Sequence, residues 1–165
     1  MKHWAFVGLW LLGLTGCTIS YSTVGVNVPA EAKTVAIKQF QNNAALVNLK
    51  LANELTTKLK DKFQSSTKLS LVNSRGDLSF EGEITNYAIT STAVGTDMAT
   101  MNRLSITIRI AYANRFDEDK STEKTFTRYV DFDSGLNLSA VEDQLVGELC
   151  DALVDDIFAA TVGDW

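Results

Sequence analysis

One segment of the chain, residues 103–115, alternates between apolar and polar or small side chains without a break. Its large apolar members are Leu104, Ile106, Ile108, Ile110 and Tyr112. Because successive side chains of a β-strand point to opposite faces of the sheet, these residues share one face. The chain must therefore build a sheet with one buried face and one face open to water or to a partner.

Other segments of the chain predict the remaining strands and two helices. Strands are expected over 34–40, from Leu69 to Leu71, over 78–89 and over 124–132, with a hairpin loop over 95–101. In 78–89 the even positions Phe80, Gly82 and Ile84 are expected to face the core. Apolar residues at helical spacing predict a helix within 44–63.

A second helix is expected near the C-terminus. Ser139 and Glu142 match a capping box, in which the two side chains satisfy free backbone N–H groups. The apolar residues that follow are spaced by four: Val141, Leu145, Leu149, Leu153 and Ile157. Two helices cannot cover both faces of the sheet, so the sequence predicts an α/β two-layer sandwich, with a mixed four- to five-stranded sheet and both helices packed on one face.

The N-terminus predicts a lipoprotein. Residues 1–16 combine a basic start with an apolar run too short to span a bilayer, as in a signal peptide. Leu14-Thr15-Gly16-Cys17 matches the bacterial lipobox, so we expect cleavage before Cys17 and acylation of its thiol and amine. The alternative is a chance cysteine after an ordinary signal peptide. Residues 17–33 are expected to form the lipidated N-terminus and an extended tether, and 34–165 a single domain.

Charge and histidine content narrow the function. The net charge of −5 and pI of about 4.8 argue against a nucleic-acid binder, which needs a basic surface. The only histidine, His3, lies in the predicted signal peptide, so the mature protein would lack histidine-based triads and zinc sites. No glycine-rich phosphate loop is present either. We therefore predict a protein that is not an enzyme, with no cofactor, no metal and no catalytic residue.

The residues that follow Cys17 predict where the lipoprotein is located in the cell envelope. Thr18, rather than aspartate, follows the cysteine, which removes the inner-membrane retention signal known from enterobacteria. No acidic run that would direct export to the cell surface follows it either. The expected location is the outer membrane, lipid-anchored and facing the periplasm.

Arg103, Arg109 and Arg115 are the candidate contact residues for a partner or for a ligand. They share the polar face of one strand and span about 40 Å at roughly 3.3 Å per residue. Guanidinium groups form two-pronged contacts with phosphates and carboxylates. The alternative is pairing within the protein, since Glu81 and Glu83 are expected on the same face of the neighbouring strand.

Three other features have structural interpretations. Cys150 lies among helical apolar residues and is expected to be a buried small hydrophobe rather than a reactive thiol. Asp131 and Asp133 could bind a metal, but a strand end beside Ser134-Gly135 favours turn residues. Arg128 lies two positions after the apolar Phe126, so both side chains are expected on the same face of the strand. A charged residue on that face predicts either a bulge or a buried ion pair.

After the lipobox, a series of motifs runs over nearly the whole mature chain: 29–37, Phe40, 42–44, 59–63, 76–78, 80–84, 102–104, Phe126, 128–129 and 131–132. In their order and spacing these motifs resemble the LptE-like lipopolysaccharide-assembly lipoproteins of the Bacteroidetes type. One departure follows Cys17, where the family often has glycine and then an aromatic residue, and this chain has Thr18-Ile19-Ser20-Tyr21.

The resemblance implies a plug inside an LptD-type outer-membrane β-barrel. Such a protein helps the barrel assemble and insert lipopolysaccharide into the outer leaflet, and the two-layer sandwich is also the family's fold. It would be held to the membrane through its lipid anchor, and direct contact with lipopolysaccharide stays open. A free-standing periplasmic lipoprotein that binds a small ligand or an envelope polymer is the alternative.

Overall fold

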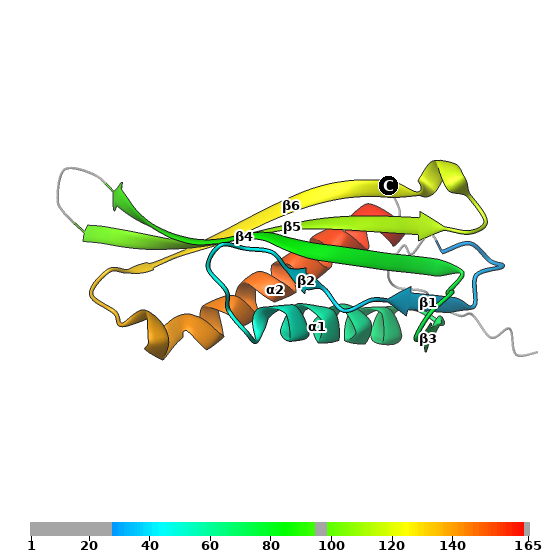
Figure 1. The fold of residues 1–165 in the computed structure, drawn as a ribbon, viewed down its shortest axis with the longest axis horizontal. Helices are drawn as coiled ribbons and strands as arrows, with labels where there is room; N and C mark the ends of the chain where they lie inside the picture. The colour runs from blue at the N-terminus through cyan, green and yellow to red at the C-terminus, as the bar shows by residue number, and fades with distance from the viewer. Residues whose placement is uncertain (1–27, 95–98, 164–165) are drawn as a thin grey trace, which may run out of the picture.

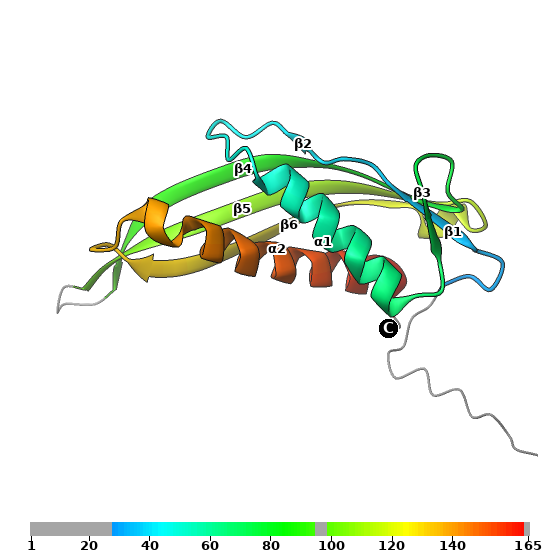
Figure 2. The ribbon, with the colours of Figure 1, turned by 90° about the horizontal axis from the view of Figure 1, so that it is seen from below.

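The computed structural model describes residues 28–94 and 99–163. The elements follow one another as β1 (Thr34–Ile37), β2 (Gln41–Asn42), α1 (Leu51–Ser66), β3 (Ser70–Val72), β4 (Leu78–Val94), β5 (Ala99–Asn114), the 3-10 turn η1 (Glu118–Lys120), β6 (Thr122–Asp133) and α2 (Leu138–Val162). Both helices cover one face of the sheet, and the other face is bare (Figures 1 and 2). The predicted α/β sandwich is confirmed.

The sheet has six strands, slightly more than expected. Its order is β3-β1-β4-β5-β6, and β2 pairs with β4 beside β1. β1 runs parallel to β3 and β4, whereas β4, β5 and β6 form antiparallel pairs. The sheet is therefore mixed, as predicted, and the extra strand is the two-residue β2.

The core lies between the sheet and the helices. Leu104, Ile106, Ile108 and Ile110 of β5 are fully buried, as their alternation predicts. Phe63 of α1 packs against Phe80 of β4 with the rings tilted and against Phe158 of α2 edge-on, with ring centroids 4.9 and 5.2 Å apart. The helices run side by side and are linked by lysine–aspartate pairs such as Lys58–Asp151 and Lys62–Asp155.

Strands β4 and β5 are longer than the predicted segments, and a bulge divides β4. The pairing with β5 shifts between Ile84 and Asn86, so Thr85 is skipped. Before the bulge the even positions face the core, and after it the odd position Tyr87 is buried. The end of the β4–β5 hairpin extends past the helices (Figure 1).

Two expectations about the helix starts are wrong. The first helix begins at Leu51, not at Ala44, because Asn48 Oδ1 accepts the backbone N–H groups of Lys50 and Leu51 at 2.9 and 3.1 Å and starts the helix there. The capping box is absent, since Asn137 caps α2 by accepting the Ser139 N–H.

The tether lies partly outside the described residues. Val28 and Ala32 pack against the core, in agreement with a tether that packs in part. The predicted signal peptide and Cys17 lie outside the described residues. No helix in 28–94 or 99–163 is long and apolar enough to cross a membrane.

Candidate functional site

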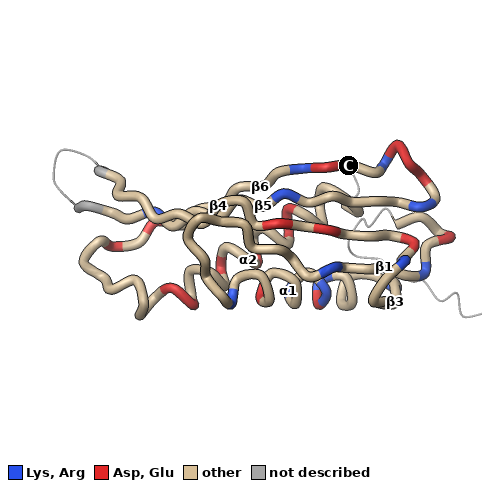
Figure 3. Tube along the Cα trace, viewed as in Figure 1, with Lys and Arg blue, Asp and Glu red and all other residues tan. Residues whose placement is uncertain are grey.

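The candidate site is the open face, which we define as the side of the sheet turned away from α1 and α2. Residues of β5 on this side, such as Arg103, Ser105 and Thr107, alternate with the buried ones. Their partners across the strands include Glu83 on β4 and Asp131 on β6. Figure 3 shows that charges of both signs are interspersed along these strands. The expected open, polar face is therefore present.

Arg103 lies at the hairpin end of the open face in a rigid cluster. Its Nε and Nη2 donate to the two carboxylate oxygens of Asp131 at 2.7 and 2.8 Å. This two-pronged bond lowers the pKa of Asp131 and raises that of Arg103. The guanidinium carbon also lies 3.8 Å from the centre of the Tyr129 ring, a cation–π contact. Tyr129 remains 57% exposed, so much of its side chain is open to solvent.

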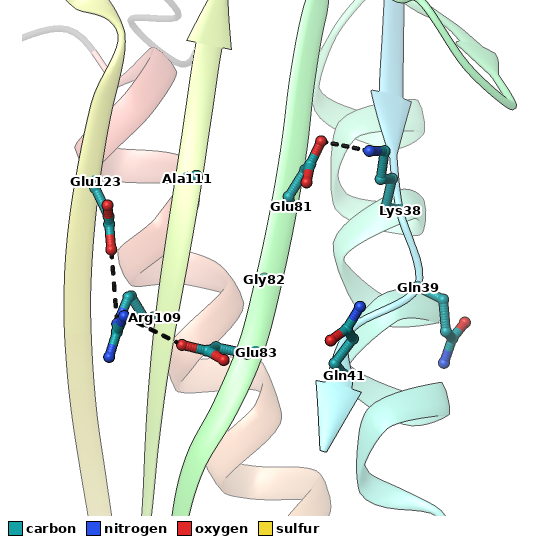
Figure 4. A pocket seen from close by; sticks show the side chains of 9 residues that line it. All are labelled: Lys38, Gln39, Gln41, Glu81, Gly82, Glu83, Arg109, Ala111 and Glu123. Carbon is teal, nitrogen blue, oxygen red and sulfur yellow. Dashed lines mark hydrogen bonds and ion pairs between the residues drawn. The ribbon is translucent and has the colours of Figure 1, made fainter. Parts of the chain in front are cut away.

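Arg109 lies at the middle of the open face between two carboxylates. It is 3.3 Å from Glu83 on β4 and 3.6 Å from Glu123 on β6 (Figure 4). Glu83 also accepts a hydrogen bond from Asn43 Nδ2 at 2.7 Å. The predicted pairing of Arg109 with Glu83 is confirmed, whereas Glu81 pairs with Lys38 instead.

A hollow of about 260 Å³ lies beside Arg109. It forms where the chain between β1 and β2 bows away from β4 (Figure 4). Its lining is polar and small: Lys38, Gln39, Gln41, Glu81, Gly82, Glu83, Arg109, Ala111 and Glu123. Amides and paired charges over a floor of small residues can hydrogen-bond a polar ligand.

Arg115 lies at the opposite end of the strand and is weakly held. Its Nη1 is 3.9 Å from Asp77, and its side chain is 74% exposed. Asp77 itself accepts hydrogen bonds from the backbone N–H groups of Lys33 and Thr34 and from the Thr34 hydroxyl, at 2.9 to 3.1 Å. These bonds, the Lys33 N–H first, lower the pKa of Asp77.

The structure thus places all three predicted arginines on one face, each beside a carboxylate. It does not bring them together, because Arg103 and Arg109 lie apart on β5 and Arg115 follows the end of that strand. Tyr129, Asp131, Glu123 and Lys38 are the members that the sequence analysis missed as site residues. For Asp131 and Tyr129 the signal was available, since their odd positions on β6 match the odd positions of the β5 arginines.

Arg128 and Cys150 lie away from the open face. Arg128 stays in register opposite Ile106, so no bulge is present, and it reaches from the edge strand to Asp156 of α2 at 2.5 and 2.6 Å. This ion pair is half-exposed rather than buried. Cys150 is fully buried, and burial raises the pKa of its thiol to about 12, which keeps it protonated and unreactive.

The end of β6 forms a turn in which Asp133 takes part. Asp133 Oδ1 accepts the Gly135 N–H at 2.7 Å, which is the expected turn contact. Within 28–94 and 99–163, no group of three or more Cys, His, Asp or Glu residues could hold a metal ion. The open face can make ion pairs, hydrogen bonds and one aromatic contact.

Comparisons with known proteins give a family and a fold. A family model described as LptE, lipopolysaccharide-assembly, matches residues 32–161. A search of curated protein sequences finds no match.

Several solved structures share the fold. A minor lipoprotein from Acinetobacter baumannii is 16% identical with a TM-score of 0.51, over 77% of this chain and 90% of that one. The rare lipoprotein B from Shewanella oneidensis is 14% identical with a TM-score of 0.51, over 78% of this chain and 92% of that one. Protein XCC0632 from Xanthomonas campestris is 13% identical with a TM-score of 0.51, over 83% and 92%. At this identity the likeness concerns the fold alone.

Proposed function

Because the chain belongs to the LptE lipopolysaccharide-assembly family, we propose that it is an outer-membrane lipoprotein that pairs with an LptD-type β-barrel. In that complex it assists the assembly of the barrel and the insertion of lipopolysaccharide into the outer leaflet. The observation that carries the proposal is the family match over residues 32–161, which includes every helix and strand of the described residues except the last residue of α2. The family is one of non-enzymatic lipoproteins, and the proposal assigns no reaction to this chain.

The proposed anchor is Cys17. An acylated cysteine holds a protein to a bilayer because each buried methylene contributes about 0.8 kcal/mol, and several chains act together. Cys17→Ala is expected to leave the precursor uncleaved or misplaced. Mass spectrometry of the wild-type protein tests the anchor directly, and an unmodified N-terminal Cys17 would contradict it.

Within this proposal, Arg103, Arg109 and Arg115 contact lipopolysaccharide phosphates or acidic residues of the barrel. Each already has a carboxylate partner, so binding would exchange one anion for another. Arg109 and Arg115 have side chains that are 51% and 74% exposed. Exposed ion pairs contribute little to stability, so breaking the present pairs of these two arginines costs little free energy. Asp131 holds Arg103 with two hydrogen bonds, so Arg103 is the harder one to recruit.

Charge reversal tests the arginines. Arg103→Glu with Arg109→Glu should weaken barrel association and raise the sensitivity of cells to detergent and large antibiotics. Lys60→Glu with Lys124→Glu makes the same change in net charge off the open face and serves as the control. If both double variants behave like the wild type, the arginines only form ion pairs within the protein and do not contact a partner.

Co-purification separates the proposal from its alternative. A plug subunit should leave the membrane in detergent together with a large β-barrel in equal amounts. A free-standing binder of a small ligand or envelope polymer should come out alone, and the hollow beside Arg109 would then be its binding site. Wild-type protein that repeatedly purifies without a barrel would exclude the proposed function.

A further inference from the structure

The loop between β2 and α1 carries three aliphatic side chains in water. We define the apolar loop as residues 44–49, in which Leu46 and Val47 are each 57% exposed and Leu49 is 85% exposed. The other large apolar side chains that the described part of the chain exposes are scattered singly: Phe116, Tyr129 and Leu136. Clustered exposed aliphatic residues mark interaction sites, whereas single ones need no explanation.

Two asparagine side chains hold the apolar loop in its shape. Asn42 Oδ1 accepts the Ala44 N–H at 3.2 Å, and Asn42 Nδ2 donates to the Asn48 carbonyl at 3.1 Å. Asn48 starts α1 with its side-chain oxygen and donates from Nδ2 to Glu142 of α2 at 2.8 Å. The buried Ala44 faces the core. Hydrogen bonds thus hold the loop at both of its ends. A loop that is preorganised in this way loses little conformational entropy when it binds.

The ends of the described chain lie far from the apolar loop. The first described residues and the end of α2 both lie at the far end of α1, while the apolar loop precedes its first residue (Figures 1 and 2). With 16 residues, α1 alone spans about 24 Å. The described part of the chain therefore leaves the apolar loop uncovered, and we take another molecule as its occupant.

The charged residues around the apolar loop indicate which kind of molecule can bind there. Three carboxylates surround it: Glu83, held by Asn43, and Glu142 and Asp143 at the start of α2. Two cations lie beside these carboxylates: Lys50 pairs with Asp143 at 2.8 Å, and Arg109 lies 3.3 Å from Glu83. Three carboxylates therefore face two cations, and the rim keeps a net negative charge. An acidic rim is repelled by anionic lipid headgroups and by phosphate groups, whereas it complements a basic protein surface.

We propose that the apolar loop docks into an apolar hollow of a protein partner whose rim is basic. The proposal rests on the proposed function, in which that partner is the β-barrel. The neighbouring segments suit such a contact, because β4 from Ile84 to Val94 and β5 from Ala99 to Asn102 carry no charged residue. In Figure 3 the described ends of these two strands are drawn without Lys, Arg, Asp or Glu.

The test compares two exposed apolar sites on the full acylated protein in cells. Leu46→Ser with Leu49→Ser removes the aliphatic surface and leaves both asparagines in place. Phe116→Ser is the control, since Phe116 is 46% exposed and lies in the turn after β5, away from the loop. We expect the double variant to recover at least tenfold less barrel per molecule than the wild type, and the control to recover as much. Thermal unfolding should be alike in all three, because the side chains are exposed.

A photo-crosslinking amino acid placed at position 49 gives a second measurement that does not depend on weakened binding. An adduct with the barrel supports the proposal. Adducts with lipid alone, or no adduct, overturn it. Full barrel recovery by the double variant also overturns it and leaves the proposed function standing, whereas a wild-type protein without any barrel overturns the proposed function itself.

Discussion

Replacing Gly82 with alanine gives a prediction whose sign is decided by one contact. Gly82 lies on the core side of β4, and the ring of Phe40 occupies the place of its missing side chain. A Cβ at position 82 would lie 2.3 Å from Cε1, 2.6 Å from Cζ and 2.7 Å from Cδ1 of that ring. Phe40 is 3% exposed, so its ring has little free space to move into.

Two effects oppose each other in Gly82→Ala. Glycine in the middle of a strand is less favourable than alanine by about 0.5–1 kcal/mol, so without the contact the change would stabilise the protein. Overpacking a core costs about 1–3 kcal/mol. Since the clash involves three atoms of a buried ring, we expect the clash to dominate and the free energy of unfolding to fall by about 1–2 kcal/mol.

A double-mutant cycle isolates the contact. Phe40→Ala should itself cost about 3–5 kcal/mol, which a domain stable by about 5–15 kcal/mol can tolerate. In that background Gly82→Ala no longer meets a ring and should become neutral or stabilising. Urea unfolding followed by far-UV circular dichroism measures all four proteins. A wild-type background in which Gly82→Ala raises stability would refute the placement of Phe40 over Gly82.

Three further predictions concern the core, the thiol and one carboxylate. Ile106→Asp or Ile108→Asp should each lower the free energy of unfolding by about 3 kcal/mol or more, because both side chains are fully buried. Thr107→Asp on the open face is the control, and an equal loss of unfolding free energy in urea for this variant would contradict the assignment of faces. Cys150 should resist alkylation at about pH 8 in the folded protein and react once urea unfolds it, since burial raises the pKa of its thiol to about 12; fast labelling of the folded protein would show that the thiol is accessible. The pKa of Asp77 is lowered in the folded state, so its charge stabilises the fold above the unfolded value of 3.8 and this contribution is lost as the pH falls through the folded pKa; Asp77→Asn should therefore be less stable than the wild type at about pH 7 and lose that deficit on acidification, and a deficit independent of pH would refute the electrostatic cause.

The layered fold was predictable because it depends on periodicity. From Leu104 to Asn114 every second residue of β5 is buried, and that pattern is visible without any knowledge of the partner strands. The C-terminal helix carries its apolar residues at intervals of four for the same reason. The strand β2 was not predictable, since two residues are too few to show a period.

The predicted start of α2 was wrong because the side chain expected to cap the helix bonds to residues distant in the sequence. Glu142 fits a capping box, but it accepts hydrogen bonds from Tyr87 Oη at 2.6 Å and from Asn48 Nδ2 at 2.8 Å instead. Those partners are 55 and 94 positions away along the chain, and no local pattern contains them. Burial together with this bond to Glu142 raises the pKa of Tyr87, so its hydroxyl stays a donor.

The face of the arginines was predictable, whereas their partners were only partly so. Parity alone places Arg103 and Arg109 on the open face, but the choice of partner depends on register. Sliding a strand by two residues keeps every side chain on its face and changes every cross-strand pair. The pairing of Arg109 with Glu83 was predictable because the two residues lie on adjacent strands of one hairpin. Glu81 lies on the same strand as Glu83 but pairs with Lys38, which follows β1 and is 43 positions away in the sequence.

The two proposed contacts of this protein should respond differently to salt. Charges on the open face are neutralised within a few ångströms, as in Arg103–Asp131 at 2.7 Å, so they create little field at long range. A contact through the arginines must exchange these pairs and should weaken as salt rises, because exposed charges are screened over about 10 Å at 0.1 M ionic strength. A contact through Leu46, Val47 and Leu49 depends on burying aliphatic surface, which salt does not screen. If the complex with the barrel survives high salt but not the loss of these aliphatic side chains, the apolar loop holds the complex together and the arginines play at most a secondary part.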